Sequence, residues 1–94
     1  MNKELENKLS SREVATMMEI EHKNLLRKID GISNDLLNSK VSPAKYWIEI
    51  NSPDNSGKLS REYQITKRGC EFLAHKTTGV KGNLFTDKYM DKLS

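Results

Sequence analysis

The stretch that decides the fold covers residues 11–32 and reads SREVATMMEIEHKNLLRKIDGI. Just before it, Ser10 is followed three residues later by Glu13, a capping-box pair in which each side chain satisfies a free amide at the start of a helix. The apolar residues that follow recur at helical spacing. They predict a short helix over residues 11–18.

A second helix is predicted over residues 21–32. Leu25 and Ile29 are four positions apart and therefore lie on one helical face, whereas the opposite face is polar and basic. Because only residues 19–20 separate the two helices, they cannot lie antiparallel along their lengths. We expect them to cross steeply across a tight turn, as in a helix-turn-helix motif.

The turn between these helices carries an unusual residue. Many helix-turn-helix motifs have glycine four residues after a small residue such as Ala15, but this chain has Glu19 at that position. A glutamate adopts a left-handed backbone conformation only at a cost of roughly 1 kcal/mol. We therefore expect strain or an altered shape in this turn.

The middle of the chain predicts a connector followed by a β-hairpin. Residues 33–44 have the composition of a loop, with at most one helical turn over residues 35–37. Aromatic and β-branched residues then favour strands over residues 45–50 and 59–65. Residues 51–57 between them are rich in turn formers, so they are expected to form a long hairpin tip.

Two further helices complete the predicted fold. Thr66 can cap a helix over residues 67–78, and Gly79 is placed to stop that helix in a left-handed C-terminal cap. The last helix is expected over residues 84–93. The resulting order predicts an α+β fold, in which a helix-turn-helix is joined to a β-hairpin wing and two C-terminal helices in a winged-helix-like arrangement.

Length and composition indicate one small domain. The chain has 94 residues, a formal net charge of +3 and 31% charged residues, and its mean hydropathy is −0.75. We expect residues 10–94 to form a single domain behind a flexible N-terminal arm of residues 1–9. No apolar run approaches the roughly 18 residues of a membrane span, and the N-terminus lacks the apolar core of a signal peptide. We therefore expect no membrane partner and no secretion.

Residues that carry catalysis or bind metals are too few to form a site. Cys70 is the one cysteine, which excludes an internal disulfide and suits a reducing compartment. Together with His22 and His75 it gives fewer than the four ligands of a structural zinc site. We expect Cys70 to act as a small buried hydrophobic residue, and we expect no metal, no cofactor and no enzymatic activity.

The predicted second helix carries side chains suited to reading DNA. Asn24 can offer a paired donor and acceptor to adenine, and Arg27 can donate two hydrogen bonds to guanine. His22 and Lys23 lie near the N-terminal end, which recognition helices usually direct toward the bases. The alternative interpretation is an ordinary solvated basic face, which is common on exposed helices.

Further basic residues extend the candidate surface beyond this helix. Lys58 and Arg61 lie near the hairpin tip, where a wing touches a phosphate strand, although such residues also keep a sheet edge soluble. Lys67 and Arg68 place positive charge in the first turn of a predicted helix, where the helix dipole is also positive. A bound phosphate would offset this repulsion, and the alternative is that an exposed helix end simply tolerates it. The full set of candidate DNA-binding residues is Arg12, His22, Lys23, Asn24, Arg27, Lys28, Lys58, Arg61, Lys67 and Arg68.

Several separated motifs resemble the phage regulatory protein Rha family. They agree in order and spacing with residues 11–15 (SREVA), 21–27 (EHKNLLR), 65–72 (ITKRGCEF) and 77–86 (TTGVKGNLFT). The resemblance implies a temperate-phage or prophage transcriptional regulator in the cytoplasm of the bacterial host. It also places the family's HKNLLR stretch on residues 22–27, within the helix chosen above as the DNA reader.

Two functions are compatible with this resemblance. In the first, the chain binds double-stranded DNA through its helix-turn-helix. In the second, it is an antirepressor that inactivates a phage repressor by direct protein–protein binding. A homodimer is expected because one small helix-turn-helix module gives limited specificity. Tyr89, Met90 and Leu93 in the last helix are the candidate dimer surface, with closure of the core as the alternative role for them.

Overall fold

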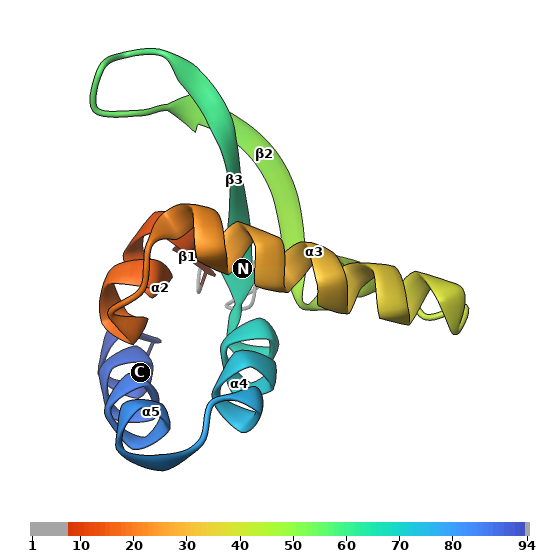
Figure 1. Cartoon of the computed structure of the whole chain (residues 1–94), viewed down its shortest axis with the longest axis vertical. Coiled ribbons are helices and arrows are strands. Elements are labelled where there is room, and N and C mark those ends of the chain that lie inside the picture. Colours follow the sequence, from red (N-terminus) through yellow and green to blue (C-terminus); the bar gives the residue numbers. More distant parts are fainter. Residues whose placement is uncertain (1–7, 94) are drawn as a thin grey trace, which may run out of the picture.

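The computed structural model, which describes residues 8–93, confirms the predicted α+β fold. Over these residues the chain forms four α-helices, one 3-10 helix and a three-stranded antiparallel sheet in a winged-helix-like arrangement (Figure 1). The elements in chain order are β1 (Lys8–Ser10), α2 (Ser11–Met18), α3 (His22–Asn38), η1 (Pro43–Lys45), β2 (Trp47–Pro53), β3 (Leu59–Thr66), α4 (Lys67–Lys76) and α5 (Gly79–Leu93).

The first helix has the predicted bounds, but only the Ser10 half of the predicted capping box forms, because the Glu13 carboxylate pairs with Lys92 at 3.0 Å. The Ser10 hydroxyl accepts a hydrogen bond from the Arg12 amide at 3.1 Å, which caps α2 at its N-terminus. Glu19 ends the helix with φ 60° and ψ 42°, in the left-handed region where glycine was expected. The Ile20 amide then donates to the Ala15 carbonyl at 3.0 Å. The turn therefore keeps the shape of a glycine turn, and Glu19 bears the conformational strain.

Helix α3 is longer than predicted, and this corrects the boundary set at Ile32. The helix continues to Asn38, through the first half of what was expected to be a connector. Gly31 does not end the helix, because it lies at an exposed position inside α3 where a glycine is tolerated. Beyond it, Leu36 continues the inward-facing apolar pattern.

The sheet has the strand order β1-β3-β2 and includes a strand that was not predicted. In β1, Leu9 lies opposite Ile65 of β3, and both side chains are buried. The predicted arm of residues 1–9 is therefore corrected at Lys8 and Leu9, because pairing to β3 fixes these residues in the sheet. The remainder of that arm, residues 1–7, lies outside the described residues.

Strands β2 and β3 form the predicted hairpin, and its tip extends beyond the helices (Figure 1). The pairing runs from Trp47 opposite Ile65 to Pro53 opposite Leu59. One side chain organises the tight turn, because an Asp54 carboxylate oxygen accepts the Lys58 amide at 3.1 Å. The hairpin is thus longer and more regular than the predicted loop over residues 51–57.

The two C-terminal helices differ from the prediction at their boundaries. Helix α4 begins with the predicted Thr66 cap but ends at Lys76. Gly79 has the expected positive φ of 75°, but it starts α5 and does not stop α4. Gly82 lies inside α5, where a Cβ would collide with the Thr77 carbonyl oxygen. Because glycine at this position permits the close approach, α5 begins at Gly79, five residues before the predicted start at residue 84.

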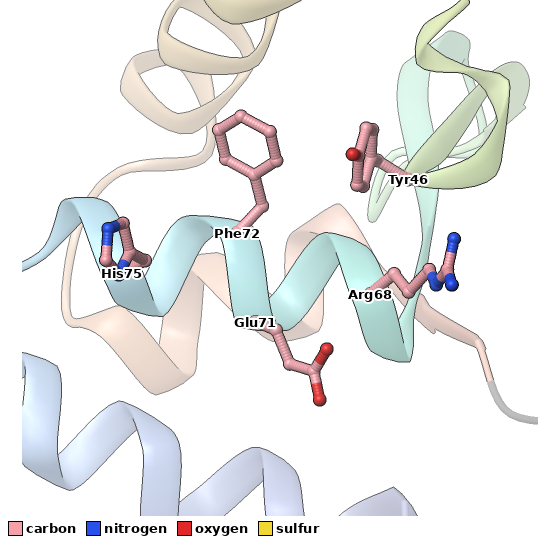
Figure 2. Close-up of a pocket in the computed structure, with 5 residues that line it drawn as sticks. All are labelled: Tyr46, Arg68, Glu71, Phe72 and His75. Atoms are coloured by element: carbon pink, nitrogen blue, oxygen red, sulfur yellow. The ribbon is translucent and has the colours of Figure 1, made fainter.

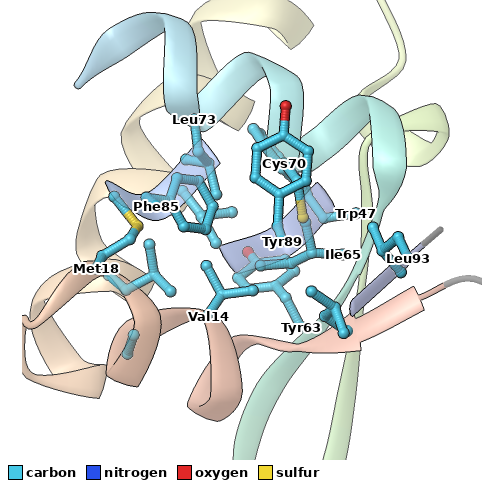
Figure 3. Packing of buried hydrophobic residues seen from close by; sticks show 14 residues of the cluster. Val14, Met18, Trp47, Tyr63, Ile65, Cys70, Leu73, Phe85, Tyr89 and Leu93 are labelled. Atoms are coloured by element: carbon cyan, nitrogen blue, oxygen red, sulfur yellow. The ribbon is translucent and has the colours of Figure 1, made fainter. Parts of the chain in front are cut away.

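The core lies where α2, α4 and α5 meet the inner face of the sheet and α3 (Figure 3). Fully buried side chains come from every one of these elements: Val14, Leu25, Ile29, Ile65, Cys70, Leu73 and Phe85. Burial raises the pKa of the Cys70 thiol to about 12, which confirms its predicted role as a buried apolar residue. No helix within residues 8–93 is both long enough and apolar enough to cross a membrane.

The candidate dimer surface on the last helix is corrected by this packing. Tyr89 is 5% exposed and Leu93 is 7% exposed, so both side chains close the core (Figure 3). Met90 is exposed, but it lies on a different side of the helix. An interface between copies that uses Tyr89 and Leu93 would require the core to open.

Candidate nucleic-acid interface

The N-terminal half of α3 separates its side chains into a buried face and an exposed polar face. Leu25 and Ile29 are completely buried and hold the helix against the core. Four of the five side chains of this helix that were predicted to contact DNA are exposed, all but His22, and they will be called the α3 face: Lys23, Asn24, Arg27 and Lys28. The packing of the apolar residues therefore presents these polar groups outward.

The positive charges of the α3 face are largely free of internal partners. Within the part of the chain that the structure describes, Arg27 and Lys28 make no ion pair. The Lys23 ammonium lies 4.0 Å from the Glu21 carboxylate, but both side chains are about 70% exposed, so the pair is weak. These cations are available to phosphates or base edges.

The hairpin turn lies beside the start of α3. A shallow hollow between them is lined by side chains from both elements and from α2: Arg12, His22, Asp54, Asn55 and Ser56. Lys58 is exposed at the same turn, as expected for a wing residue. The fold therefore brings the N-terminal end of α3 and the hairpin tip onto one part of the surface (Figure 1).

Arg12 was predicted to contact phosphates, but its guanidinium has partners inside the chain. Its Nε donates to Glu62 at 2.9 Å and its Nη2 donates to Ser60 at 2.6 Å. Burial alone would raise the pKa of Glu62, but hydrogen bonds from Ser52 and Arg12 outweigh burial and lower it. Arg12 thus joins α2 to β3 and neutralises a buried carboxylate.

Arg61 also has internal partners, and they connect the hairpin to α3. Both terminal nitrogens of Arg61 donate to the Asp30 carboxylate at 2.8 Å, and the Tyr63 hydroxyl donates to the same carboxylate at 2.7 Å. The hydrogen bonds from Arg61 are the main reason why the pKa of Asp30 is lowered. We call this arrangement the Asp30 clamp, because it joins two side chains of the hairpin to one carboxylate of α3.

His22 occupies the first position of α3 and is only partly exposed. Its Nε2 lies 2.7 Å from the Ser11 hydroxyl, which also accepts the Tyr63 amide at 2.9 Å. Burial first, and then the nearby positive charge of Arg12, lower the pKa of His22 below 6.5. The lowered pKa favours the uncharged form of His22, and its contact with Ser11 joins α3 to α2.

Lys67 and Arg68 are exposed in the first turn of α4. They therefore belong to a different helix from the α3 face. Arg68 borders a shallow hollow that also contains Tyr46, Glu71, Phe72 and His75 (Figure 2). The Tyr46 and Phe72 rings meet edge to face there, with their centroids 4.9 Å apart. Within residues 8–93, no group of three or more His, Cys, Asp or Glu side chains is placed to hold a metal ion.

Comparison with known proteins then identifies the family. The family model for phage regulatory protein Rha matches residues 9–94. The chain belongs to the phage regulatory protein Rha family. This Rha-family chain is 40% identical over 84 residues to the "SPbeta prophage-derived putative antirepressor protein YoqD" of Bacillus subtilis (strain 168). The alignment covers 89% of the chain and 34% of that relative, so the chain spans about a third of the relative's length. No solved structure matches this Rha-family chain.

Sequence reasoning missed the acidic residues that organise the interface of this Rha-family chain. Asp30 and Glu62 lie 31 and 50 positions from their arginine partners, so no local spacing could indicate these pairs. The sequence did not mark Glu62 as buried, because β3 (LSREYQIT) mixes polar and apolar residues along its length.

Proposed function

We propose that this Rha-family regulator binds double-stranded DNA by placing the α3 face in the major groove. The observation that carries the proposal is the outward presentation of Asn24 and Arg27 beside the exposed charges of Lys23 and Lys28. Asparagine pairs with adenine and arginine with guanine through two hydrogen bonds each, so both residues are suited to direct readout. The site of action would be the cytoplasm of the bacterial host.

The hairpin supplies the second contact in this proposal. Lys58 is exposed at the turn and would touch the phosphate backbone beside the groove. Arg12 and Arg61 support the site without touching DNA, because their guanidinium groups are committed to Glu62 and Asp30. The Asp30 clamp would then keep the hairpin at a fixed distance from the helix that reads the bases.

Substitutions on the two contact regions test this proposal. Against a duplex selected from a random DNA pool, Arg27→Ala should weaken binding by about 1–3 kcal/mol and relax the preference at one base pair. Lys58→Ala should weaken binding to all sequences alike. Lys81→Ala, which removes the same charge from an exposed position on α5, is the matched control and should leave affinity nearly unchanged. Full affinity in both Arg27→Ala and Lys58→Ala would refute the assignment.

A second candidate function is direct binding to a repressor protein. It is favoured by one observation, the antirepressor description carried by the relative from Bacillus subtilis. Salt separates the two functions, because phosphate contacts make log K fall linearly with log salt at about 0.9 per neutralised phosphate. A mostly apolar protein interface would show little salt dependence. Pull-down from a host lysogen, with and without nuclease, would show whether any partner is held directly or through DNA.

A further inference from the structure

The shallow hollow on α4 is a surface that the proposed DNA contact does not use. We call it the α4 hollow; its volume is about 420 Å³, and it is lined by Tyr46, Arg68, Glu71, Phe72 and His75 (Figure 2). The hairpin turn precedes β3 and α4 follows it, so the eight residues of this strand, about 26 Å in length, separate the turn from α4. Figure 1 accordingly shows α4 at the end of the fold opposite to the hairpin tip.

Two aromatic rings form the floor of the α4 hollow, and the backbone beside them is held in place. The Tyr46 and Phe72 rings are both half-buried, and both pack on Trp47, with ring centroids 5.7 Å and 5.8 Å from that of Trp47. The Tyr46 carbonyl accepts the Thr66 amide at 2.9 Å, directly before α4 begins. A Cβ at Gly69 would collide with the same carbonyl, so glycine permits this close approach. The floor is therefore formed before any partner binds.

Positive charges surround this aromatic floor. The Lys45 ammonium lies 5.4 Å from the centre of the Tyr46 ring, and the Lys76 ammonium lies 6.0 Å from the centre of the Phe72 ring. Arg68 precedes Phe72 by four residues and therefore lies on the same side of α4. All three cations are exposed, and within residues 8–93 none of them makes an ion pair. The rim of the hollow is therefore cationic.

The acidic residue on the lining does not neutralise this rim. The Glu71 side chain points away from the Tyr46 and Phe72 rings (Figure 2). This divergence follows from the helix, because consecutive residues such as Glu71 and Phe72 point about 100° apart around its axis. The open side of the hollow therefore combines an apolar floor with unpaired positive charge.

This combination favours an acidic protein segment over a nucleic acid. A base that stacks on protein needs an open ring face, but the Lys45 and Lys76 ammonium groups lie over the two rings. Carboxylates can pair with these ammonium groups where they lie. An aromatic side chain between the carboxylates can then pack against the floor, because aromatic rings prefer edge-to-face and offset contacts. In such an interface the buried anchor supplies most of the affinity and the charges supply specificity.

We propose that the α4 hollow docks a short acidic segment of a partner protein, with one aromatic side chain of that segment seated against Tyr46 and Phe72. Carboxylates on either side of this anchor pair with Lys45, Arg68 and Lys76. The proposal goes beyond DNA binding, because the hollow contains no residue of α3 or of the hairpin turn. A segment docked there leaves the α3 face open.

Binding of a defined peptide to the whole chain tests this proposal. The probe is a fluorescein-labelled peptide with a central tryptophan between glutamates, and fluorescence anisotropy measures its affinity. Replacing the tryptophan with alanine, or the glutamates with glutamine, should weaken binding at least about tenfold. Lys45→Glu and Lys76→Glu should each weaken binding of the original peptide at least about fivefold, because the new carboxylate repels the glutamates. Lys28→Glu, the same change at an exposed position on α3, is the matched control and should bind the peptide as the unmodified chain does.

Amide-resolved NMR of the labelled chain shows where the peptide binds. The largest shifts should fall on residues 45–46 and 68–76, while the amides of residues 22–28 hardly move. A single-stranded oligonucleotide that moves the same amides at a lower concentration than the peptide would identify a nucleic-acid site. Movement of these amides when the chain alone is concentrated would identify a second copy as the occupant. Either result would overturn the proposal.

The proposal is also overturned if the peptide binds more weakly than a Kd of about 1 mM, or if Lys28→Glu weakens it as much as Lys76→Glu does. A DNA arm separates this proposal from the proposed function. Lys76→Glu should bind the selected duplex as the unmodified chain does, whereas Lys28→Glu should bind it more weakly. A chain that binds the peptide at the α4 hollow but binds no DNA would refute the proposed function and leave the docking site supported.

Discussion

Removal of the Asp30 carboxylate is expected to loosen the hairpin from α3 and to lower stability measurably. In Asp30→Ala, two hydrogen bonds from Arg61 and one from Tyr63 are lost. The side chains of Arg61 and Asp30 are 37% and 42% exposed, so water screens the pair and its contribution is at most about 1 kcal/mol. Tyr63 is buried, and leaving its hydroxyl without a partner costs about 1 kcal/mol more.

The expected loss is therefore about 2 kcal/mol in the free energy of unfolding, or roughly 10 °C in Tm for a domain of this size. Thermal and urea unfolding followed by circular dichroism measure it. Asp35→Ala is the matched control, because Asp35 is an exposed aspartate on the same helix. Both variants replace aspartate with alanine, so both gain the same helix propensity. Equal stability of the two variants would refute the role of the clamp.

The pH dependence of this difference provides a further check. Arg61 holds the pKa of Asp30 below its ordinary value, so the carboxylate is charged and clamped at neutral pH. A lowered pKa in the folded state gives stability that is present above the ordinary pKa and is lost as the pH falls through the folded value. The difference in the free energy of unfolding between the unmodified chain and Asp30→Ala should therefore become smaller at acid pH.

Four further predictions concern single positions. Glu19→Gly should raise the free energy of unfolding by up to about 1 kcal/mol, because glycine adopts the left-handed conformation without strain, whereas Glu19→Ala should not raise it. Gly82→Ala should destabilise the chain by about 1–3 kcal/mol through collision with the Thr77 carbonyl. Gly31→Ala, at an open helical position, should instead stabilise it by about 0.5–1 kcal/mol. The pKa of His22 is lowered in the folded chain, so protonation of His22 favours the unfolded state. The free energy of unfolding, measured in urea, should therefore decrease as the pH is lowered from about 7.5 to 5.5. In His22→Gln this decrease should be smaller.

Local patterns were sufficient to predict much of the fold. The cap at Ser10 and the apolar spacing after it gave α2 its observed bounds, because the first turn of a helix is determined largely by neighbouring residues. The hairpin was predicted for the same reason, since strand and turn chemistry are encoded within a few positions. The left-handed turn at Glu19 was also identified as the position of conformational strain.

Features that depend on distant partners could not be predicted. The part of α3 beyond Gly31 makes a contact with a distant residue, because the Ser33 hydroxyl accepts a hydrogen bond from the Trp47 indole at 2.7 Å. No local sequence pattern indicates that contact. For the same reason the pairing of Arg61 with Asp30 could not be predicted, because a basic side chain near a hairpin tip has the same sequence signature whether it meets a phosphate or a carboxylate. Exposure of Asn24 and Arg27 followed from helical period alone.

The most direct test of the central claim is an amide-resolved NMR titration of the labelled chain with a DNA duplex selected from a random pool. The proposed interface predicts that the largest shifts fall on residues 22–28 of α3 and on residues 54–58 of the hairpin turn, while the amides of α5 hardly move. No shifts at an excess of DNA, or shifts centred on α5, would contradict the claim that α3 reads DNA.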